Sequence, residues 1–390
     1  MTRFILPLLL LCAGLITHLP AIAQSDDCPV GSTLLEQSFS SGAQWTLCAE
    51  VNASHGLTLS KVRYRAPGDT SRSVLHLAHL GQILMHYHDQ LDALPLILNP
   101  PGNRHRLLPI TENNCDGERL IEQAGIARLC SRIEDNIFLS KYATIPALHS
   151  KNWELSTVLQ REFLTLAVSV TFSEDGVITP AISFSGISAD YGSNPLYAQT
   201  LNGSTLAVTR TTILATWRLV FDLDTPAFDK VEQYEFPLLT ARSNRRPMQV
   251  RPFAREILAN INRENFRGWR IRDPDGPGYY LDPSNSGFDY RSQEYNWAQF
   301  DLAVTRFKAC EQYATNNSAL AESSACGRNL DNFINGETLQ GAQPVLWFTQ
   351  SRTLDPSNED WPIIRNFRQS FSLMPFDWTT FSPFDSQMVR

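Results

Sequence analysis

The chain has 390 residues, of which 43% are hydrophobic and 19% are charged, so it can bury a large core and is neither disordered nor collagen-like. Its 33 basic and 40 acidic side chains give a formal net charge of -7 without a long run of like charge. This balance excludes the basic surface that a nucleic-acid-binding protein needs.

The first 23 residues have the pattern of a secretory signal peptide. Arg3 precedes an apolar run from Phe4 to Ile16, and the segment ends in the small-residue sequence Ala21-Ile22-Ala23. We expect cleavage after Ala23, a mature single domain at 24–390, and a location in a periplasm or outside the cell. No later stretch has the roughly 20 apolar residues of a membrane span, so no membrane association is expected.

Six cysteines remain after this cleavage, and an oxidising compartment favours three disulfide bonds among them. Many pairings are possible, but proximity in the sequence favours pairing each cysteine with its neighbour. The expected pairs are Cys28 with Cys48, Cys115 with Cys130, and Cys310 with Cys326. None of these spacings is typical of zinc ligands, which favours a structural role.

Most of the mature chain has strand patterns. Apolar residues alternate with polar or small ones from Leu164 to Phe172, and a turn at Glu174-Asp175-Gly176 leads into a second β-rich stretch at Val177 to Ile187. Trp217, Leu219 and Phe221 share one face of a further strand. The patterns predict an all-β domain of two packed sheets with a few short helices.

One segment has a helical period. Phe253, Ile257, Leu258 and Ile261 follow Pro252 at spacings that predict one amphipathic helix.

Three stretches resemble signatures of the copper amine oxidases. The most specific is Val345-Leu346-Trp347-Phe348-Thr349, followed by Glu359-Asp360-Trp361-Pro362-Ile363 and by a final strand at 371–376. Gly56 to Tyr64 is similar to the hairpin near the start of the catalytic domain of that family, and Trp217 to Asp224 is similar to its RxDxDxD-like strand.

This resemblance implies a copper-amine-oxidase-like β-super-sandwich and a homodimer. It also implies oxidative deamination of primary amines, with copper and a quinone that is made from one of the protein's own tyrosines. Fold does not confer chemistry, so each residue of the family's site has to be sought in this chain.

The copper ligands of the family have no counterpart. Two of them form an HxH-like pair before the RxDxDxD-like strand, where residues 211–216 read Thr-Thr-Ile-Leu-Ala-Thr, and the third falls at Leu354. No histidine follows His149. Hydroxyl and alkyl groups do not replace imidazole as copper ligands, so copper binding at this place is not expected.

The quinone and the general base are also without counterparts. Depending on where a gap is placed against the family's motif, Arg161 or Leu164 falls at the position of the quinone tyrosine. Asp92 is the only aspartate between Asp89 and Cys115, where the base is expected. We therefore predict loss of catalysis, with no catalytic or cofactor-binding residues.

A different candidate metal site is His86-Tyr87-His88-Asp89, at a different place in the sequence from the family's copper ligands. Residues i and i+2 of a strand point to the same side, so His86 and His88 could share a metal ion with Asp89. His76, His79 and His105 are possible further ligands. The alternative is that both histidines are surface or hydrogen-bonded core residues.

Asp222, the carbonyl of Leu223, and Asp224 match the pattern with which the family holds a peripheral calcium ion, although Gln343 replaces another frequent aspartate. The alternative, to which we give equal weight, is that these aspartates end a strand and face the solvent.

A local basic stretch is interpreted as a solvated face or a dimer-arm contact, and it consists of Arg242, Arg245, Arg246, Arg251 and Arg255.

Two functional hypotheses follow. The first is a secreted, non-catalytic binding or scaffold homologue that pairs with itself, with an active paralogue or with another secreted protein. The second is an active amine oxidase, or another metal-dependent oxidoreductase, whose ligands have moved to the region of His86 and His88.

Overall fold

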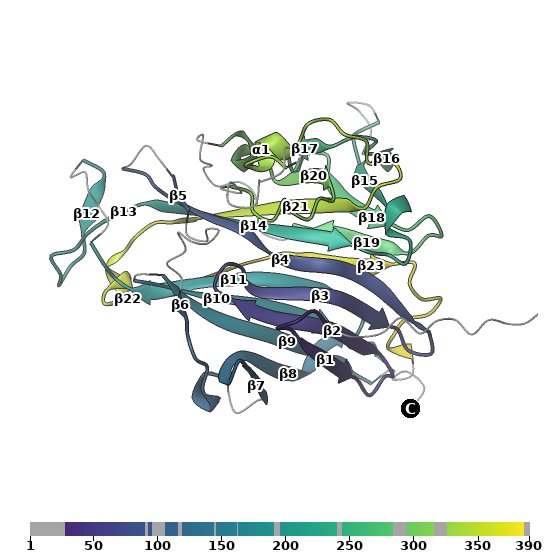
Figure 1. Ribbon diagram of the computed structural model, residues 1–390, viewed down its shortest axis with the longest axis horizontal. Coiled ribbons are helices and arrows are strands. Elements are labelled where there is room, and N and C mark those ends of the chain that lie inside the picture. Colours follow the sequence, from purple (N-terminus) through teal and green to yellow (C-terminus); the bar gives the residue numbers. More distant parts are fainter. Residues whose placement is uncertain are drawn as a thin grey trace, which may run out of the picture.

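The computed structural model describes residues 28–89, 93–95, 106–115, 119–143, 146–161, 163–190, 196–239, 244–283, 295–315 and 326–385. Two large antiparallel sheets, here called sheet A and sheet B, are stacked on each other (Figure 1). This arrangement confirms the all-β, two-sheet prediction.

Sheet A has nine strands in the described part of the chain. Its order is β1 (Thr33–Ser38), β2 (Gln44–Asn52), β3 (Gly56–Arg65), β4 (Ser71–Tyr87), β14 (Thr211–Phe221), β21 (Pro344–Leu354), β20 (Leu302–Arg306) and β17 (Ile257–Ala259), with β5 (Ala93–Pro95) paired to β4.

Sheet B has twelve strands in the same described ranges. Its order is β16 (Gln249–Pro252), β15 (Lys230–Glu235), β18 (Gly268–Arg272), β19 (Gly278–Asp282), β23 (Ser372–Phe376), β11 (Ile178–Ile187), β10 (Leu164–Ser173), β9 (Leu148–Arg161), β8 (Ile126–Ser140) and β7 (Arg119–Gln123), with β22 (Ile363–Ser370) on β11 and β6 (Arg106–Leu107) on β9.

The remaining elements are small. A hairpin of β12 (Ala198–Thr200) and β13 (Ala207–Thr209) projects at one end of the molecule, and α1 (Leu330–Phe333) lies over the β20–β21 side of sheet A (Figure 1). Within the described segments there are also single turns of 3-10 helix: η1 (Glu112–Asn114), η2 (Pro226–Phe228), η3 (Asn296–Gln299) and η5 (Asn358–Asp360). None of the helices in the described segments has the length and apolar character to span a membrane.

The main core lies between the two sheets because the strands present alternate residues to it. On β10 the even-numbered apolar residues from Leu164 to Phe172 are buried, as the sequence pattern predicts. Trp45 and Trp217 join them from sheet A, and both are almost fully buried. A second apolar cluster, which includes Leu214, Trp347 and Phe333, covers the outer face of sheet A beneath α1.

The three predicted disulfide pairings are confirmed: Cys28–Cys48, Cys115–Cys130 and Cys310–Cys326 are bonded.

The predicted amphipathic helix after Pro252 is wrong. Pro252 ends β16, and Ile257 to Ala259 form β17, which pairs with β20 in the register Ile257 to Val304. The preceding Glu256 carboxylate accepts hydrogen bonds from the backbone N–H groups of Arg306 at 3.1 Å and Asn335 at 2.9 Å. Tertiary pairing of this edge segment with β20 therefore outweighs its helical spacing.

Candidate functional site

The two segments expected to carry copper ligands do lie side by side. β14 pairs with β21 so that Thr211 faces Leu354 and Ala215 faces Gln350. Ile213 and Ala215 are fully buried in the core between the sheets, and Leu354 packs against that core. The side chains of Ile213, Ala215 and Leu354 have no donor atom for a metal, and neither the Thr211 hydroxyl nor the Gln350 amide replaces an imidazole, so the residues present do not fit copper at the family's position.

The two residues expected at the quinone tyrosine lie at the end of β9 and at the start of β10. Arg161 and Leu164 are partners in the strand register, and Leu164 is also opposite Gly186 of β11. Leu164 is buried in the inter-sheet core. Neither residue has the phenol from which a quinone is made. Asp92, at the expected position of the base, lies outside the described residues.

His86 and His88 come together at the end of β4, as their spacing predicts. Their ring centroids are 5.5 Å apart, and His86 is directly opposite Thr212 of β14. His88 Nε2 is 2.9 Å from the Thr212 hydroxyl, which is itself 2.9 Å from the hydroxyl of Thr353 on β21. Burial lowers the pKa of His88, and His86 and Arg210 lower it further.

This pair is adjacent in space to the strand expected to hold copper, although it is distant in sequence. Residues alternate across β14, so Thr212 points away from sheet B whereas Ile213 points toward it. The histidine pair therefore occupies the outer face of sheet A, opposite the face on which Ile213 and Ala215 lie.

The other histidines named from the sequence are not brought to this pair. His76 contacts Phe307 edge-on, and His79 lies on His55 with ring centroids 3.9 Å apart. His105 lies outside the described residues. Within the described ranges, no group of three or more His, Cys, Asp or Glu side chains is arranged to hold a metal ion.

The calcium candidates Asp222 and Asp224, at the end of β14, accept hydrogen bonds from another part of the protein. The Ser73 hydroxyl donates to Asp222 Oδ2 at 3.0 Å, and the Ser73 backbone N–H donates to Asp224 Oδ1 at 3.2 Å. The Gln343 amide donates to the carbonyl of Phe221 at 2.7 Å. Calcium binding by Asp222 and Asp224 stays a prediction from the resemblance.

The arginines of the basic stretch are mostly on the surface. Arg245, Arg251 and Arg255 are exposed, whereas Arg246 donates to the carbonyls of Phe236 and Glu264. Arg242 lies outside the described residues.

A buried pair of histidines was not anticipated from the sequence. His55 Nδ1 and His79 Nδ1 lie 2.9 Å and 3.0 Å from the same acceptor, the carbonyl oxygen of Leu80. A carbonyl only accepts, so both rings carry their proton on Nδ1. Burial lowers the pKa of His55 to about 4 and that of His79 well below its ordinary value, and the charge of Arg218 acts in the same direction. Tyr313 stacks on His55 with centroids 4.7 Å apart.

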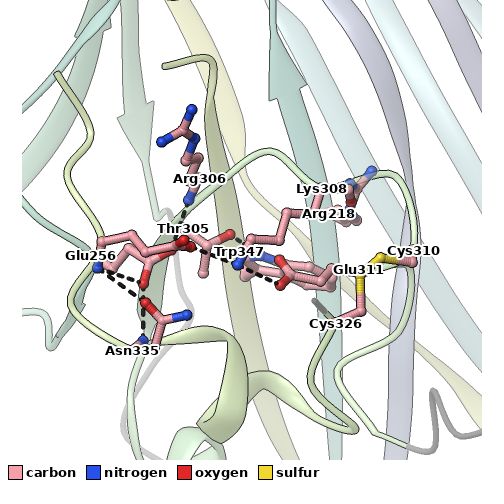
Figure 2. Close-up of polar contacts among 11 residues, drawn as sticks. Arg218, Glu256, Thr305, Arg306, Lys308, Cys310, Glu311, Cys326, Asn335 and Trp347 are labelled. Atoms are coloured by element: carbon pink, nitrogen blue, oxygen red, sulfur yellow. Dashed lines mark hydrogen bonds and ion pairs between the residues drawn. A yellow bond between two sulfur atoms is a disulfide. The ribbon is translucent and has the colours of Figure 1, made fainter. Parts of the chain in front are cut away.

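Arg218 is an almost fully buried charge, only 1% exposed, on the outer face of sheet A (Figure 2). Its guanidinium lies 5.5 Å from the ring centroids of both Phe307 and Trp347, and Nη2 donates to the carbonyl of Lys308 at 3.3 Å. Burial lowers the pKa of Arg218 to about 10, which the nearby Glu311 carboxylate partly offsets.

Glu311 is the acidic partner of this region. Burial raises its pKa to about 7, although Lys308 Nζ lies 3.5 Å away and lowers it. The neighbouring Cys310 is bonded to Cys326, which ties this segment to the chain before α1 (Figure 2). In the sequence the only signal for this network was a single arginine inside the apolar run of β14.

Asp229, also missed from the sequence, is a nearly buried carboxyl group between η2 and β15. Its Oδ2 accepts a hydrogen bond from the backbone N–H of Leu223 at 3.1 Å, and its Oδ1 has no hydrogen-bond partner. Burial raises the pKa of Asp229 to about 8, and the charges of Asp273, Asp222 and Asp224 add to this effect.

Comparison of the fold with solved structures identifies its class. The described architecture matches the Aspergillus nidulans amine oxidase (TM-score 0.71, 16% identity, 93% of this chain and 56% of that one) and a copper-containing benzylamine oxidase from Hansenula polymorpha (TM-score 0.70, 15% identity, 98% of this chain and 65% of that one). At these identities the likeness shows the fold: a copper amine oxidase β-sandwich. The chain spans only about half to two thirds of the length of these proteins.

Sequence comparison gives the family. The model of the copper amine oxidase enzyme domain matches residues 165–387, more than half of the chain. The mouse protein "Amine oxidase [copper-containing] 2" is 27% identical over 138 residues, which cover 34% of this chain and 18% of that protein. The chain therefore belongs to the copper amine oxidase family, as the resemblance of its motifs predicts.

Proposed function

We propose that this protein is a non-catalytic member of the copper amine oxidase family that acts as a binding or scaffold module. The observation that carries the proposal is the composition of the β14–β21 pair, where Ile213, Ala215 and Leu354 occupy the expected ligand region. A buried apolar cluster at this place gives copper no donor and leaves the fold intact.

The decisive experiment measures copper per protomer after incubation with Cu(II) and dialysis, together with peroxide release from primary amines. The proposal expects no copper at β14–β21 and no amine-dependent peroxide. The double variant His86→Ala/His88→Ala serves as the control for surface binding. One copper per protomer that persists in this variant, or peroxide release in the wild type, would contradict the proposal.

A second candidate function is supported by the geometry of His86 and His88. Their rings are close, they share one face of the strand, and a threonine hydroxyl ladder adjoins them. A metal ion held there with Asp89 would make the protein a metal-dependent oxidoreductase with relocated ligands. This function requires amine-dependent peroxide release that disappears in both single variants, His86→Ala and His88→Ala. An unchanged rate in either one rules it out.

We also propose that the protein is exported, with residues 1–23 removed and 24–390 folding as one domain. The three disulfides support an oxidising compartment. Mass spectrometry of the protein from the periplasm or the medium tests this, because cleavage after Ala23 predicts an N-terminal Gln24.

Association as a homodimer, or with an active paralogue, is the third part of the proposal. Exposed apolar side chains near the β15–β16 hairpin support a protein contact, since Leu239, Met248 and Val250 are all more than 40% exposed. Sedimentation equilibrium tests it: a monomer at every concentration would exclude the homodimer.

A further inference from the structure

The turn of the β12–β13 hairpin contains an exposed Asn-Gly pair. The Ser204 backbone N–H donates to the carbonyl of Leu201 at 3.1 Å, and Gly203, at the third position of this turn, has a φ of 78°, as in a type II β-turn. Asn202 and Gly203 are both exposed, and the hairpin projects at one end of the molecule (Figure 1). Water therefore reaches both residues.

The peptide group between Asn202 and Gly203 is unrestrained. Within the described ranges, the Asn202 carboxamide, the Asn202 carbonyl and the Gly203 N–H form no hydrogen bond. A Cβ atom at Gly203 would meet only Trp361 Cδ1, at 4.0 Å, so the space around the pair is open. Glycine also has the widest backbone freedom of all residues. The peptide group can therefore rotate toward the Asn202 side chain without breaking a hydrogen bond.

The other Asn-Gly pair of the sequence, Asn335-Gly336, is held in place. Asn335 Oδ1 accepts from the backbone N–H of Glu337 at 3.1 Å, so the side chain itself is bonded. The Glu256 carboxylate accepts from the N–H groups of Asn335 at 2.9 Å and Glu337 at 3.3 Å (Figure 2), and Arg255 donates to the Gly336 carbonyl at 2.6 Å. Rearrangement of this turn has to break hydrogen bonds to charged groups, which are the stronger ones.

We propose that Asn202 is a site of spontaneous deamidation. The backbone nitrogen of Gly203 loses its proton and attacks Cγ of Asn202, the bond from Cγ to the side-chain nitrogen breaks, and that nitrogen leaves as ammonia with the proton. One water molecule then adds to either carbonyl of the resulting succinimide ring and opens it to aspartate or to isoaspartate. The step needs no oxidant or reductant, and it occurs whether or not the protein is catalytic.

The modification changes how the hairpin is attached. The Asn202 backbone N–H donates to Asn358 Oδ1 at 2.8 Å, which links the turn to the first residue of η5. Isoaspartate carries the main chain through its side-chain carbon, so it lengthens the turn by one atom, and the link to Asn358 is lost. Deamidation therefore also adds a negative charge to an exposed end of the molecule and loosens the hairpin from η5.

Peptide mass spectrometry during incubation of the folded protein tests the proposal. Trypsin releases Asn202 in the peptide 162–210 and Asn335 in the peptide 329–352, and deamidation replaces an NH group by a heavier oxygen atom. We expect Asn202 to react at least about tenfold faster than Asn335, because only the latter has to break hydrogen bonds to a carboxylate first. The rate at Asn202 should rise with pH, since the amide nitrogen must lose its proton. In denaturant both pairs should react at similar rates.

Asn202→Gln is the matching variant, because it keeps the amide but would need a larger, more slowly formed ring. Ion-exchange chromatography should show an acidic form that accumulates in the wild type and is lost in Asn202→Gln. Asn335→Gln, the same change at the other pair, should accumulate it as the wild type does. Equal rates at the two pairs in the folded protein, no reaction at Asn202 while the denatured chain reacts, or undiminished accumulation in Asn202→Gln would each overturn the proposal.

Discussion

His88 directly follows β4, and its Nε2 lies 2.9 Å from Oγ1 of Thr212, a residue of the strand segment in which the family's paired copper ligands are expected. The contact joins the one histidine pair that the sequence singles out to that segment, but from the side of sheet A that faces away from sheet B. It shows that the ligand-bearing strand of the family and the histidine-bearing strand of this chain are direct neighbours.

The Thr212 hydroxyl should contribute measurably to stability. Thr212→Val keeps the shape but removes a partner of both His88 and Thr353, so we expect a loss of about 1–2 kcal/mol in the free energy of unfolding. Thr216→Val is the matched control, because the Thr216 and Thr349 hydroxyls form a similar buried pair at 3.0 Å without a histidine. Chemical denaturation of both variants isolates the contribution of His88. Equal losses would mean that His88 adds nothing.

The Asp229 carboxyl makes stability fall with rising pH. Its pKa is about 8 in the folded protein and about 3.9 when unfolded, so between these values only the folded state holds the proton. The wild type therefore loses stability as the pH rises from about 4 to 8.

Asp229→Asn removes this titration. The difference in Tm between variant and wild type should be smallest near pH 4 and should grow in favour of the variant toward pH 8. A difference that does not change with pH would show that Asp229 titrates normally.

The His55–His79 pair acts in the opposite direction. Burial depresses the folded pKa of His55 to about 4, whereas the unfolded chain takes up the proton near pH 6.5. Stability is therefore present above pH 6.5 and is lost as the pH falls from about 6.5 toward 4, by up to about 1.4 kcal/mol per pH unit for each group.

His55→Asn retains a nitrogen donor for the Leu80 carbonyl but does not titrate, so the slope of stability against pH should become shallower in this interval. His76→Asn changes an exposed histidine on β4, the strand that carries His79, and should keep the wild-type slope. Denaturant titrations at several pH values provide the slopes. A wild-type slope in His55→Asn would contradict the buried, neutral state of the ring.

Arg218 and Glu311 should be energetically coupled. Arg218→Met fits the space between Phe307 and Trp347 but removes the cation that lowers the pKa of Glu311, so we expect a loss of about 2–4 kcal/mol. Glu311→Gln should reduce this loss when the two changes are combined. A double-mutant cycle by denaturation measures the coupling, and strictly additive effects would show that the two charges do not interact.

Sequence patterns predicted those parts of the fold in which many residues give the same structural signal. The alternation from Leu164 to Phe172 predicted β10, and proximity predicted all three disulfides. The pattern failed for 253–261, because the hydrogen bonds of Glu256 and the pairing of Ile257 with Val304 come from segments distant in the sequence. A short apolar stretch fits both the helical period and the strand period, so its structure is ambiguous until such partners are known.

Candidate sites were predicted less completely, for a physical reason. His86 and His88 share one element, so their proximity follows from strand geometry alone. Asp229 looks like an ordinary surface charge in the sequence, and Arg218 is marked only by the apolar run around it. Their altered pKa values arise from burial in the folded chain, in the case of Arg218 against Phe307 and Trp347, which no local pattern reveals.

The separation of paired residues along the chain sets the order in which the molecule can assemble. Each disulfide joins cysteines only 15 to 20 residues apart, whereas the hydroxyl pair of Thr216 and Thr349 links strands across 133 residues. Local loops close quickly, and non-local strand pairing is slow. Oxidation can therefore precede the joining of β4, β14 and β21, and we expect this joining to be the slower step and the one during which unpaired strand edges are exposed to proteolysis and aggregation.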